Sequence, residues 1–122
     1  MNIEDFRNYC LTKKGVTESF PFDENTLVMK VIGKMFALTD LESEFSINLK
    51  CDPEYAIELR EKYQSVQPGY HMNKNHWNTI YVDGSIPEKL IYSLVDDSYN
   101  LVVKSLTKKQ QNELNSNKIQ IN

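Results

Sequence analysis

Apolar and polar positions follow two different periods along this chain, and the change from one to the other marks the predicted elements. Near the start, Ile3, Phe6 and Cys10 recur at helical spacing. Asn2 precedes them and can cap the helix, and two acidic residues occupy its first turn. Because Gly15 ends the pattern, we predict a first helix between Asn2 and Gly15.

A period of two follows, which predicts strands. The stretch TLVMKVIGKMFALT, residues 26–39, contains two apolar runs joined at Gly33 and Lys34, as in a tight hairpin. The run FSINLKC, residues 45–51, alternates between apolar and polar side chains, so one face of its sheet should be exposed to water. The shorter stretch VTESFPF, residues 16–22, has a proline near its end and suits an edge strand or a loop entry.

The helical period returns twice in the second half of the chain. In DPEYAIELREKY, residues 52–63, the Asp-Pro pair provides an N-cap and a first helical residue. WNTIYV, residues 77–82, then reads as a strand. The longest helix is predicted from Ser85 onward, with Ser85 and Glu88 in capping-box register.

This order of elements predicts an α+β fold, a two-layer α/β sandwich in which helices cover one face of a largely antiparallel sheet. A chain of 122 residues with 40% apolar content can form one hydrophobic core without a disulfide or a metal. We expect residues 1–106 to form that single domain. Residues 107–122 read as a polar C-terminal tail, with room for one short helical turn between Thr107 and Leu114.

Composition limits the partners and the cellular location that we expect for this protein. The net charge of −3 argues against a protein that coats nucleic acid through bulk charge, so a phosphate contact would need a local patch. The N-terminus lacks the basic and apolar regions of a signal peptide, and no apolar run is long enough for a membrane span. We therefore expect a cytoplasmic protein, with Cys10 and Cys51 reduced.

The residue patterns do not favour a metal centre or catalysis. The two histidines, His71 and His76, are not accompanied by a zinc-ligand spacing, and we expect no metal and no cofactor. Cys51 with either histidine is the one nucleophile and base pairing worth considering. Since Cys51 falls on the apolar side of its strand, we predict a buried, inert thiol and a protein that is not an enzyme.

The stretch QPGYHMNKNHWNTI, residues 67–80, has the strongest concentration of polar chemistry. It contains rings, amides and one lysine, and no acid occurs between Glu61 and Asp83. Such a mixture suits contact with nucleic acid, and Lys50, Arg60 and Lys62 on neighbouring segments could extend it. The residues alone rather favour the alternative, a polar turn in which Trp77 anchors a strand to the core and the asparagines cap a loop.

Longer stretches resemble a known family. GVTESFPF, VMKVIGKMFAL, INLKCDPEYAIELREKY and VQPGYHMNKNHWNTIYVDGSIP resemble the MmcQ/YjbR family of small bacterial proteins. The resemblance implies a CyaY-like fold and DNA binding through a double-wing-like arrangement of strands. CyaY and its relatives handle iron with an acidic surface, but the first helix here has only Glu4 and Asp5 for such a surface. The candidate contact residues on the matching motifs are Lys50, His71, Asn73, Lys74, His76 and Asn78.

Together the residues and the resemblance predict a non-enzymatic, DNA-binding or regulatory protein whose DNA binding is weak and sensitive to salt. The alternative is a module that binds a small molecule or a protein, with a pocket at the 68–80 loop. Nothing in the sequence sets an oligomeric state.

Overall fold

The computed structural model describes residues 1–69 and 72–116, which form four helices and one six-stranded sheet. Neighbouring strands are all antiparallel, in the order β1-β2-β3-β4-β6-β5. The elements along the chain are α1 (Ile3–Leu11), β1 (Val16–Ser19), β2 (Thr26–Val31), β3 (Lys34–Asp40), β4 (Ser46–Lys50), α2 (Pro53–Lys62), β5 (Val66–Pro68), β6 (Trp77–Tyr81), α3 (Glu88–Ser105) and α4 (Lys108–Ser116).

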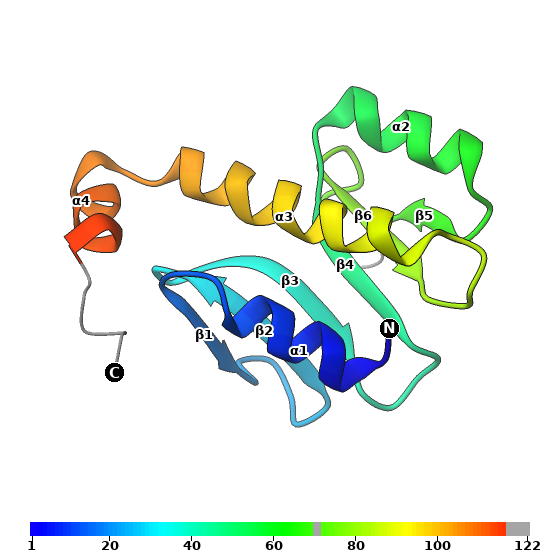
Figure 1. Ribbon diagram of the computed structural model, residues 1–122, viewed down its shortest axis with the longest axis horizontal. Coiled ribbons are helices and arrows are strands. Elements are labelled where there is room, and N and C mark those ends of the chain that lie inside the picture. Colours follow the sequence, from blue (N-terminus) through cyan, green and yellow to red (C-terminus); the bar gives the residue numbers. More distant parts are fainter. Residues whose placement is uncertain (70–71, 117–122) are drawn as a thin grey trace.

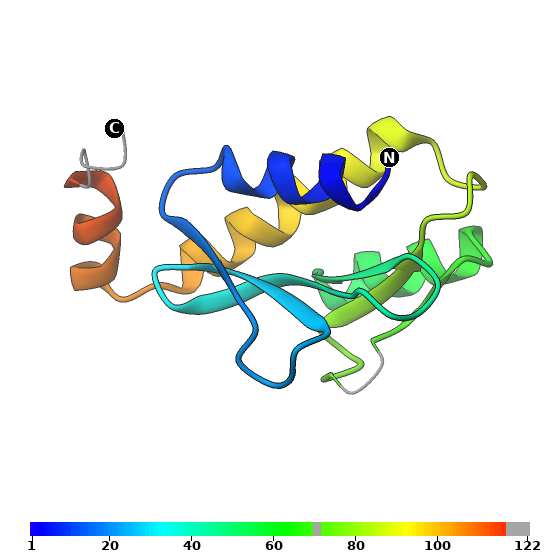
Figure 2. The ribbon, with the colours of Figure 1, turned by 90° about the horizontal axis from the view of Figure 1, so that it is seen from below.

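The molecule has two layers, with α1 and α3 lying across one face of the sheet (Figures 1 and 2). α2 packs beside β5 and β6, and its Ala56 and Leu59 join the same hydrophobic core. That core lies between the helices and the inward side chains of the strands, such as Met29, Ile47 and Ile80. The predicted α+β sandwich with an antiparallel sheet is therefore confirmed. We call the other side of the sheet the helix-free face.

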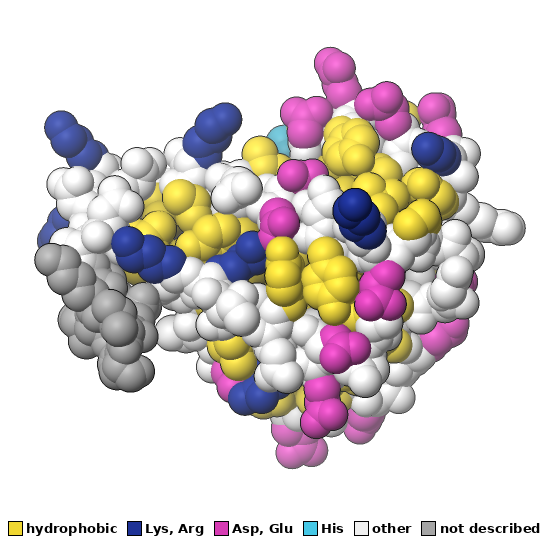
Figure 3. Space-filling model, viewed as in Figure 1, with side chains coloured by type: hydrophobic (Ala, Val, Ile, Leu, Met, Phe, Trp, Pro, Cys, Tyr) yellow, Lys and Arg dark blue, Asp and Glu magenta, His cyan; other side chains and the backbone are white. Residues whose placement is uncertain are grey.

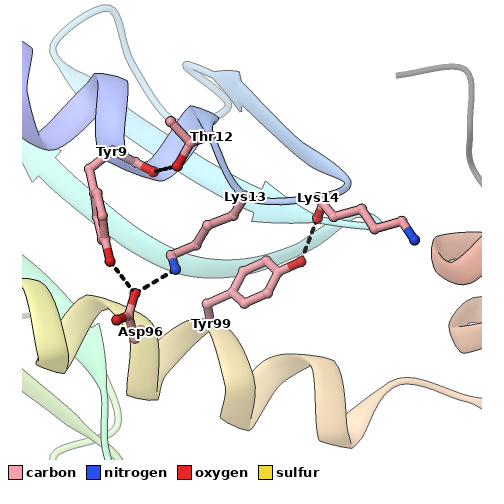
Figure 4. A network of polar contacts seen from close by, with 6 residues as sticks. All are labelled: Tyr9, Thr12, Lys13, Lys14, Asp96 and Tyr99. Carbon is pink, nitrogen blue, oxygen red and sulfur yellow. Dashed lines mark hydrogen bonds and ion pairs between the residues drawn. The ribbon is translucent and has the colours of Figure 1, made fainter. Parts of the chain in front are cut away.

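A polar network ties α1 to α3 (Figure 4). The hydroxyl of Tyr9 donates a hydrogen bond to Asp96 at 2.7 Å, and Lys13 forms an ion pair with the same carboxylate. The Lys13 ammonium lies 5.2 Å from the centroid of the Tyr99 ring, and the Tyr99 hydroxyl donates to the backbone oxygen of Lys14. These contacts hold the end of α1 against the middle of α3.

The hairpin between β2 and β3 is present, but its turn lies one residue earlier than predicted. Ile32 and Gly33 are the two turn residues, with φ of 46° and 80°, whereas Lys34 already begins β3. Two consecutive positive φ values define the turn type that matches the twist of antiparallel strands. Glycine adopts this conformation easily and a β-branched residue does not, so Ile32 is a locally strained position.

The helix starts agree with the sequence in two cases and differ in one. Asn2 caps α1, where its side chain accepts the backbone N–H of Asp5 at 2.7 Å. Asp52 caps α2 directly before Pro53, as predicted. The predicted capping box at α3 is wrong, because Ser85 instead donates its hydroxyl to Asp83 and the helix begins after Pro87.

The C-terminal segment is more structured than one helical turn. α4 buries Leu114 in the core, against the turn that follows α1. A Cβ atom built on Gly15, which has φ of +75°, would lie 2.5 Å from Leu114 Cδ1. Glycine at this position therefore permits both the backbone conformation and the close approach of α4.

Within the described ranges, 1–69 and 72–116, no helix is long and apolar enough to cross a membrane.

Candidate functional site at the basic end of the sheet

The two motifs that dominate the sequence meet at one corner of the sheet. Lys50, the last residue of β4, pairs with Trp77, the first residue of β6. The backbone N–H of Cys51 donates to the carbonyl of His76 at 2.8 Å. Arg60 on α2 donates from Nη1 to the carbonyl of Lys74 at 3.2 Å. The end of β4 and the last turn of α2 are thus both joined by hydrogen bonds to the backbone of the turn before β6.

The turn at residues 72–76 presents exposed side chains from a fixed backbone. The carbonyl of Asn73 accepts the N–H groups of His76 and Trp77, at 3.1 and 3.0 Å. The Asn73 side-chain oxygen accepts the N–H of Asn75 at 2.9 Å, so this part of the Asn73 amide shapes the turn. Lys74 and His76 are exposed. The candidate His71 lies outside the described residues.

Gly69 and Trp77 fix the entry to this turn. The N–H of Gly69 donates to the Trp77 carbonyl at 2.8 Å, and a Cβ atom at Gly69 would lie 2.8 Å from Trp77 Cβ. Only a residue without a side chain allows the two backbones to come this close.

Unlike Lys74 and His76 in the turn before it, Asn78 is buried. Its residue is only 1% exposed, and Nδ2 donates to the Ala56 carbonyl of α2 at 3.3 Å. Because β6 pairs Leu49 with Asn78 and Lys50 with Trp77, Asn78 points to the helices and Trp77 to the helix-free face. Trp77 is only 8% exposed, so its ring is buried as expected, but on the opposite face of β6 from the main core. The expectation that Asn78 contacts a partner is wrong. A buried side chain cannot make surface contacts, so Asn78 leaves the candidate set.

The Asn78 side chain is also incompletely paired. Its Oδ1 atom is buried without a hydrogen-bond partner among the described residues. Asn78 also lines a cavity of about 10 Å³ together with Leu59 and Leu94. Such a cavity has room for one water molecule.

The register of the sheet identifies further residues on the helix-free face. Lys30 of β2 lies there because Leu27, Met29 and Val31 of the same strand face the core. One row of directly paired residues crosses all six strands of this face, from a serine on β1 to a glutamine on β5. Its members are Ser19, Val28, Leu38, Asn48, Thr79 and Gln67.

Charge is distributed unevenly along this face. Lys30 and Lys50 lie toward the end of the sheet where the 72–76 turn carries Lys74. We call these three lysines the basic end. Asp40 is the only acid among the outward strand positions in the described residues, and it lies at the opposite end, paired with Thr26.

Sequence reasoning missed Lys30, although the alternation in TLVMKV was a sufficient signal for it. Lys62, a further candidate for extending the patch, lies elsewhere. Its ammonium lies 5.4 Å from the centroid of the Tyr63 ring and lines a different hollow.

That hollow, of about 580 Å³, lies at the other end of β5 and β6 from the 72–76 turn. Glu44, Lys62, Tyr63, Gln64, Ser65, Gln67, Tyr81, Asp83 and Ser85 line it. Gln67 and the adjoining strand residues connect it with the 68–80 segment. The pocket expected at that loop stays a prediction, because residues 70 and 71 lie outside the described residues.

Both cysteine thiols are buried, which lowers their reactivity. Burial raises the pKa of the Cys10 thiol to about 12 and that of the Cys51 thiol to about 11, the latter with a contribution from Asp97. A thiol that stays protonated is a poor nucleophile. In residues 1–69 and 72–116, no group of three or more His, Cys, Asp or Glu side chains is arranged to hold a metal ion.

A sequence model of the YjbR family matches residues 11–101. The chain belongs to the YjbR family. The uncharacterized protein YjbR of Escherichia coli K12 is 38% identical over 112 residues, which cover 91% of this chain and 95% of that protein. The uncharacterized protein YyaQ of Bacillus subtilis 168 is 41% identical over 114 residues, or 80% of this chain and 95% of the relative.

Solved structures show the same YjbR fold. The crystal structure of Deinococcus radiodurans protein DR2400, described with domain DUF419, has a TM-score of 0.88 and 42% identity, covering 93% of this chain and 88% of that one. A crystal structure of a Pseudomonas syringae protein gives a TM-score of 0.72 at 30% identity, with coverages of 83% and 98%. The matched range contains both motifs of the basic end, and the resemblance inferred from the sequence is confirmed.

Proposed function

We propose that this YjbR-family protein is a cytoplasmic, non-enzymatic DNA-binding protein, and that the basic end of the helix-free face is its contact surface. The observation that carries the proposal is the clustering of Lys30, Lys50 and Lys74 at one end of a face whose only described outward strand acid, Asp40, lies at the other. Lysines positioned together can neutralise neighbouring phosphates even when the total charge is negative.

The rest of the molecule is less suited to a polyanion. Acidic side chains gather over α2 and around the middle of α3 on the helical face, while lysines lie mainly near α4 (Figure 3). α2 alone contains Glu54, Glu58 and Glu61. Phosphates would be repelled from these carboxylates, which leaves the helix-free face as the favoured side.

The basic end also offers hydrogen-bonding groups beside its charges. Gln67 on β5 is exposed and Asn48 on β4 is partly exposed, whereas Thr79 between them is buried and donates its hydroxyl to Asn48. The fixed 72–76 turn presents Lys74 and His76 without further ordering of its backbone. Contacts of this kind position a protein on the phosphate backbone and need not read bases.

The test is a duplex DNA titration at several salt concentrations. If three lysines neutralise phosphates, the logarithm of the affinity should fall with the logarithm of salt at a slope of about −3. Lys50→Glu and Lys74→Glu should each weaken binding roughly tenfold at low salt and make the slope shallower by about 1. Lys62→Glu is the matched control, because it changes the net charge equally but lies beside Tyr63.

Absence of binding at about 50 mM salt, where such contacts are strong, would reject the proposal. Equal losses for all three variants would reject the assignment to the basic end, because a general charge effect would explain them. Thermal unfolding of each variant shows that it remains folded.

A further inference from the structure

At the end of the sheet opposite the basic end, two loops expose large apolar side chains. Phe20 and Phe22, in the loop that joins β1 and β2, are 47% and 64% exposed. Leu41, at the start of the loop that joins β3 and β4, is 40% exposed. We call residues 20–26 and 40–45 the acidic loop pair, for the charges described below.

Hydrogen bonds hold both loops in one conformation. Asp23 Oδ1 accepts the backbone N–H groups of Asn25 and Thr26, at 2.9 and 2.7 Å. The N–H of Leu41 donates to the Asn25 carbonyl at 2.8 Å, which joins the two loops. The β1–β2 loop extends away from the sheet on the side opposite α1 and α3 (Figure 2). Apolar side chains on a pre-ordered loop lose little conformational entropy when they meet a partner.

The charge around these side chains has one sign. The two segments carry five carboxylates and no lysine, arginine or histidine, the acids being Asp23, Glu24, Asp40, Glu42 and Glu44. The ion pairs found among the described residues involve other carboxylates. Hydrogen bonds from Asn25 and Thr26 hold the pKa of Asp23 below its usual range, so this carboxylate stays charged near neutral pH.

We propose that the acidic loop pair is a docking surface for a basic protein segment that carries apolar side chains. Exposed apolar groups and five carboxylates on the same two joined loops fit a partner whose lysines or arginines meet the acids while its apolar groups cover Phe20, Phe22 and Leu41. DNA is disfavoured here, because its phosphates would face five like charges. This surface is separate from the basic end, and the inference does not depend on DNA binding.

The probe is a short amphipathic peptide composed of lysine and leucine, titrated into the full chain while the backbone amide NMR spectrum is followed. Two control peptides replace the lysines by glutamate or the leucines by serine. Phe22→Ser and Glu42→Lys should each weaken binding of the lysine and leucine peptide about tenfold. The matched controls are Ile57→Ser and Glu58→Lys, which alter an apolar residue that is 50% exposed and an exposed acid on α2.

The proposal is supported if shifts concentrate in residues 20–26 and 40–45, if both control peptides fail, and if only the loop variants lose affinity. It is overturned if the shifts spread over α2, or if the α2 variants lose as much affinity as the loop variants. It is also overturned if the protein self-associates and Phe22→Ser makes it monomeric, because a second copy would then be the occupant. Unchanged DNA affinity in Phe22→Ser separates this result from that for the basic end.

Discussion

The hydroxyl oxygen of Ser98 on α3 accepts the backbone N–H of Lys50 at 2.8 Å. The same hydroxyl donates to the carbonyl of Phe36, and Ser98 is fully buried. One side chain of the helical layer therefore satisfies backbone groups of both β3 and β4. It also fixes the position from which the Lys50 side chain leaves the sheet at the basic end.

Removing this hydroxyl should destabilise the protein. Ser98→Ala leaves a buried N–H and a buried carbonyl without partners, which should lower the free energy of unfolding by about 2 kcal/mol. Urea denaturation measures the change. Ser93→Ala, at an exposed position of the same helix, should alter stability by less than about 0.5 kcal/mol. Alanine is the better helix former, so propensity alone would not lower the stability of either variant. Similar losses in both variants would contradict the role of the Ser98 hydrogen bonds.

A carboxyl group at position 78 should destabilise the fold when it is ionised. Asn78→Asp places a charge at a position that is 1% exposed and packed beneath α2. We expect a loss of about 3 kcal/mol at neutral pH. Burial raises the folded-state pKa of this carboxyl above its unfolded value of about 3.9, so the penalty is absent below that value and grows as pH rises.

The measurement is urea denaturation of both proteins from acidic to neutral pH. Asn48→Asp, on the helix-free face, is the control and should lose less, since its side-chain oxygen would still accept from Thr79. A constant penalty at every pH would contradict the burial of a charge at Asn78.

The Tyr9 and Asp96 contact should appear in alkaline titration. The hydrogen bond to Asp96 raises the pKa of Tyr9 to about 12 from an ordinary value of 10. Because the folded-state pKa is the higher one, the stability this contact adds is complete below pH 10 and is lost as pH rises toward 12. Asp96→Asn should bring the Tyr9 pKa back toward 10.

Ultraviolet titration follows the tyrosinate, and the difference from Tyr9→Phe identifies the Tyr9 signal. Asp97→Asn serves as the control, since Asp97 is adjacent in sequence but Asp96 accepts the hydrogen bond. If both substitutions lower the Tyr9 pKa equally, general helix charge rather than the direct contact sets it.

The sequence predicted those features of the fold that depend on residues close to one another in the chain. Asn2 and Asp52 were identified as caps because capping depends on the next three residues. The β2–β3 turn was placed one residue late, since Ile32 is a poor candidate for positive φ and only the strand register reveals it there. Ser85 failed as a cap because Pro87 occupies that position and Asp83 takes its hydroxyl.

The candidate site shows the same distinction. Asn73, Lys74 and His76 lie together because a short turn keeps sequence neighbours close in space, and Lys50 joins them through the pairing of β4 with β6. Asn78 was misjudged because the face on which a strand residue lies depends on pairing with a distant strand, and a shift of one position reverses it. The acidic loop pair was not anticipated, since its two loops are brought together by the pairing of Thr26 with Asp40 and by the Leu41 to Asn25 hydrogen bond.

The strand order has a consequence for folding. From β1 to β4 each strand pairs with the next one along the chain, so these pairings close short loops. The pairing of Lys50 with Trp77 must instead close a loop that contains all of α2 and β5. Such non-local pairing costs more chain entropy and should come late in folding. Lys50 lies on one strand of this pair, and Lys74 lies in the turn that leads into the other. A partner that requires both lysines therefore recognises only a chain that has finished folding, and its binding would keep β4 and β6 paired.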